Sequence, residues 1–148
     1  MKAIAYNIDS FKSRPYWIID ILPKQVPAGS AGQYFTIEKY LLSPPRVSDI
    51  YRKFARVLIA LNCYHDIIVQ DGSRLLENPS PAALERLVLE RKWLNVLVGS
   101  DQAMITVTGD DHYMTLYGPS KDLLELIRNL AAGQGFYVWK PKNIKTKQ

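Results

Sequence analysis

The chain has 148 residues, of which 47% are hydrophobic and 22% charged, and this composition excludes a disordered or fibrous protein and predicts one ordinary domain with a buried core. Four of its 19 basic residues lie in the last nine positions, where there is no acid, so residues 1–139 carry 15 basic against 14 acidic side chains. The formal charge of +5 therefore does not by itself indicate nucleic-acid binding, and we expect a domain at 1–141 followed by a frayed basic tail at 142–148.

The first third of the chain predicts three strands. β-branched and aromatic residues are dense in segments 3–8, 16–22 and 33–42, and stretches rich in proline and glycine separate these segments. Pro44 and Pro45 end the third segment.

The middle of the chain predicts two helices around a short strand. Apolar residues recur at the three- and four-residue spacing of one helix face over 47–61. Residues 64–69 then form a short strand before the turn signal at Asp71 and Gly72. Ser80 is the expected N-cap of the second helix, with Pro81 at its first position.

The last third predicts a meander, a helix and a closing strand. Segments 94–98, 104–108 and 113–117 are joined by short connections that carry glycine and aspartate. Ser120 caps a helix that ends just before Gly133, and residues 136–139 form a strand. The whole chain predicts a single α+β domain, with one curved, mainly antiparallel sheet and about three packed helices.

The run Cys63-Tyr64-His65-Asp66 raises the question of a thiol hydrolase. In an extended segment, Cys63 and His65 share one face and Asp66 points to the other, so the carboxylate cannot orient the histidine. Cys63 also follows an apolar stretch, which suggests that it is buried as a small hydrophobe. We therefore expect no enzyme, and a hydrolase built on Cys63 is a third alternative.

Metal, cofactor and membrane sites are not indicated either. His112 is the only other histidine, and no paired Cys or His spacing of a zinc site occurs. Gly133-Gln134-Gly135 follows a helix and precedes a strand, which is the reverse of the order in phosphate-binding loops. The first nine residues lack the apolar stretch of a signal peptide, and no apolar run approaches the roughly 20 residues that span a bilayer. We expect a cytoplasmic protein with no metal and no cofactor.

Acidic residues and tyrosines gather between positions 100 and 125. This region has five acids against the single base Lys121, and two tyrosines lie among them. Such a combination suits an interface with a basic partner, although polar loops around a sheet explain it equally well. The candidate partner-binding residues are Asp101, Asp110, Asp111, Tyr113, Tyr117 and Asp122.

The pattern of the last third, with strands at 94–99, 103–107 and 111–117, a short helix and a final segment at 135–141, resembles the small immunity proteins of bacterial polymorphic toxin systems, including those of contact-dependent growth inhibition. The resemblance implies a non-catalytic cytoplasmic protein that binds the C-terminal toxin domain of a cognate effector and blocks its active site, often that of a nuclease. It also implies that the gene of the toxin lies directly upstream.

The alternative is an accessory domain associated with nucleic acid. The helix expected at 47–61 carries basic side chains away from its apolar stripe, and the lysine tail adds positive charge. The candidate residues are Arg46, Arg52, Lys53 and Arg56.

Overall fold

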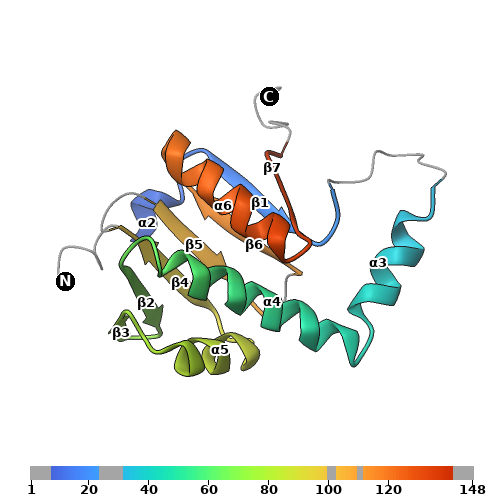
Figure 1. The fold of residues 1–148 in the computed structure, drawn as a ribbon, viewed down its shortest axis with the longest axis horizontal. Helices are drawn as coiled ribbons and strands as arrows, with labels where there is room; N and C mark the ends of the chain where they lie inside the picture. Colours follow the sequence, from blue (N-terminus) through green and yellow to red (C-terminus); the bar gives the residue numbers. More distant parts are fainter. Residues whose placement is uncertain (1–7, 24–31, 100–102, 110–111, 142–148) are drawn as a thin grey trace.

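Seven antiparallel strands form one open sheet in the order β3-β2-β4-β5-β6-β1-β7 (Figure 1). The computed structural model describes residues 8–23, 32–99, 103–109 and 112–141. The strands are β1 (Tyr16–Asp20), β2 (Ile67–Asp71), β3 (Arg74–Glu77), β4 (Leu94–Val98), β5 (Ala103–Val107), β6 (Tyr113–Tyr117) and β7 (Tyr137–Trp139).

Five helices surround this sheet in the described part of the chain, which makes the protein a single α+β domain. Helices α4 and α6 cross one face with α5 beside α4, whereas α3 projects beyond the sheet (Figure 1). The helices are α2 (Ile8–Phe11), α3 (Tyr34–Leu42), α4 (Arg46–Leu61), α5 (Pro81–Leu89) and α6 (Lys121–Gly133).

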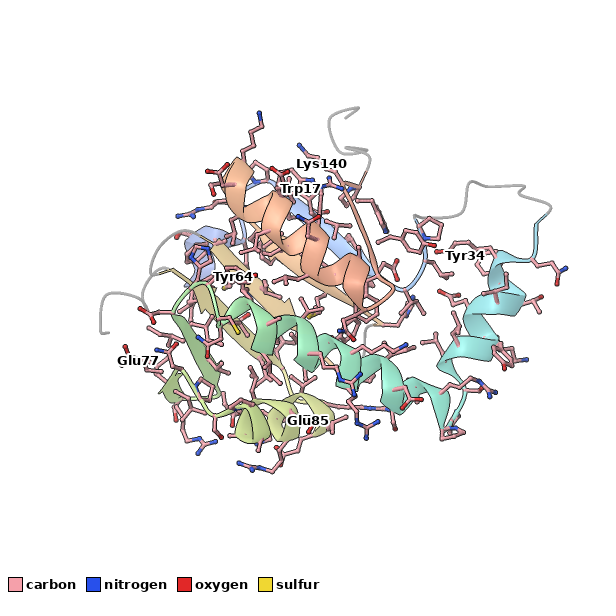
Figure 2. All side chains as sticks on the ribbon, in the orientation of Figure 1. Trp17, Tyr34, Tyr64, Glu77, Glu85 and Lys140 are labelled. Atoms are coloured by element: carbon pink, nitrogen blue, oxygen red, sulfur yellow. The ribbon has the colours of Figure 1, made fainter. Side chains whose placement is uncertain are left out.

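The main core lies between the sheet and the layer formed by α4, α5 and α6. Phe54 of α4 is fully buried, and its ring lies 4.9 Å from that of Phe136. Strand residues alternate between the two faces of the sheet, so Leu94, Val96 and Val98 of β4 all point into this core. At the rim, Lys140 lies over the Trp17 ring, 5.1 Å from its centroid, and Figure 2 shows the two side chains together.

The opposite face of the sheet has a thinner cover. Phe11 of α2 packs there against Leu97 and Met104, and together they belong to a second, smaller apolar cluster. Asn95 and Thr106 also point to this face, and the Thr106 hydroxyl donates a hydrogen bond of 2.9 Å to Asn95 Oδ1. Asn95 Nδ2 in turn donates to Gln70 Oε1 at 2.8 Å, which satisfies these buried polar groups across three strands.

The helices expected over 47–61, from Pro81 and after Ser120 are confirmed, as are the strands expected at 94–98, 104–108, 113–117 and 136–139, with small shifts of their ends. Ser80 and Ser120 cap their helices, each accepting a backbone hydrogen bond of 3.1 Å. Helix α6 extends through Gly133 rather than ending before it. The strand expected at 64–69 begins at Ile67, because a turn follows α4.

The strand expected at 33–42 is wrong, because this segment is helix α3. Its aromatic residues favour strands, but the Ile37 N–H donates to the Gln33 carbonyl in the hydrogen bonding of a helix. None of its residues is buried, so the segment lacks the stripe of buried apolar residues at helical spacing that would have indicated a helix. The strand expected at 3–8 lies outside the described residues except for Ile8, which begins α2. Strand β3 was not foreseen.

Candidate functional site

A groove of about 720 Å³ lies on the thinly covered face of the sheet, between its β6-β1-β7 part and α3. The lining carries six aromatic side chains from four separate parts of the chain. These are Tyr16, Tyr34, Phe35, Tyr113, Tyr117 and Trp139.

The strand register sets the order of side chains along the groove. Tyr16 of β1 pairs with Tyr117 of β6, and their ring centroids are 5.9 Å apart. Burial, with a smaller effect of the nearby Tyr16, raises the pKa of the Tyr117 hydroxyl. Two residues further along β1, Ile18 lies between Thr115 and Trp139. Alternate residues of each strand thus form one aromatic surface.

Asp20 ends this row and is the most unusual residue of the groove. It lies between Tyr113 and Tyr137 in the register and is only 4% exposed. Burial raises the pKa of its carboxyl, and hydrogen bonding to the Leu22 N–H (3.4 Å) and the nearby His112 act in the opposite direction. In the described part of the chain, no basic side chain lies within ion-pair distance of Asp20. A carboxylate in this position has hydrogen bonds but no ion pair among the described residues, and its burial carries a desolvation cost.

Helix α3 forms the second wall and is tied to the residue before β6 by a side-chain contact. His112 Nε2 lies 2.9 Å from Glu38 Oε2, with both side chains partly buried. Figure 2 shows Tyr34 on the side of α3 that faces the sheet, and burial, with smaller effects of Asp20 and Glu38, raises the pKa of its hydroxyl. The groove thus gathers titratable groups that are distant in sequence.

The outer part of α3 leaves large apolar side chains in solvent. Phe35 is 67% exposed and lines the rim of the groove, and Ile37 and Tyr40 are also exposed. Arg46 stacks on the Tyr40 ring at 3.9 Å and donates to the Tyr40 carbonyl, which fixes the end of the helix. Exposed apolar area beside a groove is typical of an interaction surface.

Trp139 contributes a hydrogen-bond donor that the described residues leave unsatisfied. Its indole Nε1 atom is buried and has no hydrogen-bond partner among them. A buried N–H without a partner costs free energy, and such a group in a native structure calls for an explanation.

The predicted partner-binding residues are only partly brought together. Tyr113 and Tyr117 lie in the groove. Asp122 lies elsewhere, in a second hollow of about 560 Å³ that Tyr64 and His65 also line, so the structure does not bring it together with the two tyrosines. Asp101, Asp110 and Asp111 fall outside the described residues.

The basic residues of the alternative reading lie on or beside α4. Arg52 lies 3.0 Å from Asp49 and 3.8 Å from Glu85, so acids balance its charge. Arg46 is engaged with Tyr40, as described above. Lys53 and Arg56 are exposed on the same helix.

The expected burial of Cys63 is wrong. The helix ends two residues before it, and Cys63 is exposed in the turn that follows. Asn78 Nδ2 donates to the Asp66 carboxylate at 3.2 Å, and Asn62 donates to the His65 carbonyl. This run therefore serves as a hydrogen-bonded turn between α4 and β2.

Asp20, Glu38 and Tyr34 were missed as site residues. One signal for Asp20 was available, because an acid inside the apolar run Tyr16-Trp17-Ile18-Ile19-Asp20-Ile21-Leu22 is unusual in a strand. No signal pointed to Glu38, because the segment around it predicted a strand.

The described residues contain no group of three or more His, Cys, Asp or Glu side chains that could hold a metal ion. None of the helices in the described ranges has the length and apolar character needed to cross a membrane. No family model, curated protein sequence or solved structure matches the chain.

Proposed function

We propose that this protein is a non-catalytic inhibitor of the immunity type, which binds the toxin domain of a cognate effector and blocks its active site. One observation carries the proposal: an aromatic groove on the sheet lies directly beside a projecting helix with exposed apolar side chains. Aromatic residues are enriched in the centres of protein interfaces and dominate their binding energy.

The chemistry of the groove supports binding. Stoichiometric inhibition requires area, shape and charge rather than an assembled nucleophile and base. The lining supplies the six aromatic rings and the titratable side chains of Lys12, Asp20, Glu38 and His112. By contrast, Cys63 is exposed in a turn, and Asp66 is bonded to Asn78.

Part of the segment that suggested an interface lines the groove. Tyr113 and Tyr117, which were proposed as partner-binding residues, are both in its lining. The sequence pattern and the groove thus support one surface, with α3 as an addition from the structure.

The test is co-expression with the C-terminal domain of the product of the gene directly upstream, scored by growth and by co-purification. We expect rescue of growth and a stable complex. Phe35→Ala should weaken the complex by about 2 kcal/mol or more if Phe35 is an anchor. Tyr64→Ala is the matched control, because Tyr64 is equally exposed at 64% and lies outside the groove.

Two results would overturn the proposal. Absence of both rescue and complex for the wild-type protein would remove the inhibitor function. Equal loss of binding in Phe35→Ala and Tyr64→Ala would remove the groove as the interface. Nucleic-acid affinity that falls steeply with salt would favour the alternative function through Lys53 and Arg56.

A further inference from the structure

The charges that line the groove are unequally compensated. Lys12 lies over the Trp93 ring, 5.6 Å from its centroid, and Glu38 is paired with His112 at 2.9 Å. Asp20 has hydrogen bonds to the backbone N–H groups of Leu22 and Ile21 and lies near His112, but no basic side chain of the described residues forms an ion pair with it. The groove therefore contains one buried acid without an ion-pair partner among the described residues, which a cation from a ligand could pair with.

Aromatic rings surround the position of this acid. Tyr113 is the register partner of Asp20 on β6, and Tyr34 lies close enough for the Asp20 charge to raise the pKa of its hydroxyl. Trp139 pairs with Ile18, two residues before Asp20 on β1. Ring faces attract cations, and this attraction is stronger where water is excluded.

We infer that the groove recognises the guanidinium group of an arginine side chain on the partner protein, with the Asp20 carboxylate as its counter-charge and the surrounding rings as stacking surfaces. This inference rests on the proposed function and specifies the chemistry of the partner. Guanidinium is favoured over ammonium because it is planar, stacks on aromatic rings and presents a fork of donors that matches a carboxylate.

The same arrangement disfavours other ligands. An anionic ligand, such as a phosphate, would meet the negative charge of Asp20 without gaining a cation. A neutral apolar side chain would fill the groove but would bury the carboxylate further, which carries a desolvation cost.

The inference is tested without the partner, by titrating the whole protein with three capped tripeptides in which arginine, citrulline or lysine stands between two glycines. Citrulline has the shape of arginine without its charge. The readouts are the indole N–H resonance of Trp139 and the amide resonances of β1 and β6. We expect saturable shifts with the arginine peptide and at least tenfold weaker binding, corresponding to about 1.4 kcal/mol, for the citrulline and lysine peptides.

Asp20→Asn should weaken binding of the arginine peptide by the same factor, whereas Asp49→Asn, which changes an exposed acid on α4, should leave it unchanged. Equal binding of arginine and citrulline, equal binding of arginine and lysine, or an Asp20→Asn protein with wild-type affinity would each overturn the inference. Folding of each variant is verified from the dispersion of its spectrum.

The outcome also separates this inference from the proposed function. Arginine-peptide binding without a complex in the co-expression test would remove the inhibitor function and leave the recognition of arginine standing. A toxin complex with the same dissociation constant for wild-type and Asp20→Asn proteins would remove the inference and leave the inhibitor function standing.

Discussion

The Nε2 atom of His112 lies 2.9 Å from the Oε2 atom of Glu38, and this contact joins the connection after β5 to helix α3. None of the residues of α3 is fully buried: Leu41 and Leu42 at its end pack partly buried against the main core, and the His112–Glu38 contact lies on the groove side. This contact joins the two walls of the groove directly.

Glu38→Gln should therefore loosen α3 without unfolding the protein. Replacing the carboxylate acceptor of this partly buried contact by a neutral amide is expected to cost on the order of 1 kcal/mol, which corresponds to about fivefold faster amide hydrogen exchange in α3. Exchange should be measured residue by residue for wild type and variant. Glu85→Gln is the control, because Glu85 lies 3.8 Å from Arg52 on the helix surface; equal α3 exchange in the two variants would contradict the role of Glu38.

Asp20 should make stability depend on pH in a direction unusual for an acid. The pKa of its carboxyl is raised in the folded state. The contribution of Asp20 to the free energy of unfolding is therefore fully present below the unfolded-state pKa near 3.8, and it is lost as the pH rises through the folded-state pKa. The slope for one proton is at most about 1.4 kcal/mol per pH unit. Asp20→Asn, which keeps an oxygen for the Leu22 N–H, should therefore raise the melting temperature at pH 7, and this gain should vanish toward pH 4.

The measurement is the difference in melting temperature between Asp20→Asn and wild type from pH 4 to pH 7, because the difference cancels the titration of other groups. Asp49→Asn should show no such gain at neutral pH, since Asp49 is exposed and pairs with Arg52. A difference that stays constant across this range would show that burial of the Asp20 charge is not its cause.

The two serine caps should contribute similar amounts to stability. The Ser80 and Ser120 hydroxyls each accept a backbone hydrogen bond of 3.1 Å at the start of a helix, from Ala83 and Leu123. Replacing either serine by alanine should lower the free energy of unfolding in urea by about 1 kcal/mol. Ser48→Ala in the exposed part of α4 should instead be neutral or slightly stabilising, because alanine is the better helix former there.

The backbone of Arg91 passes so close to Gly109 that no side chain fits at position 109. A Cβ atom at this position would clash with the carbonyl of Arg91, and the Gly109 carbonyl accepts a hydrogen bond of 3.0 Å from Tyr51. Gly109→Ala should therefore lower stability by about 1–3 kcal/mol. Gly133→Ala has open space around it and should be neutral or stabilising, so thermal unfolding of this pair isolates the steric effect.

The sequence predicted an element correctly where its apolar residues follow the spacing of one secondary structure and form one buried face. Helix α4 has a complete apolar stripe, and its prediction was confirmed to within one residue at its start. The meander β4-β5-β6 was equally readable, because its short connections contain glycine and aspartate. Helix α3 was missed because Tyr34, Phe35 and Tyr40 favour strands. None of them is buried, so their spacing does not show the apolar stripe of a helix.

The groove was only half predictable for a different reason. Tyr113 and Tyr117 were expected at an interface because they lie near acids in the sequence. Asp20 and Glu38 come from segments that meet Tyr113 only through the pairing of β1 with β6 and the return of α3. Local sequence patterns do not show which distant strands pair with each other. The sequence therefore could not predict that Asp20 and Glu38 lie beside Tyr113.

The hydrogen-bonded row of Gln70, Asn95 and Thr106 gives the sheet a means of rejecting misaligned strands. All five residues of β4 are buried, so hydrophobicity alone distinguishes its two faces poorly. A slip of one residue would turn the Asn95 side chain into the leucine- and valine-rich core. Its hydrogen bonds to Gln70 and Thr106 would be lost, and burying the unpaired amide would cost free energy. These three side chains therefore encode the alignment of β2, β4 and β5, and with it the position of the strands that carry the groove.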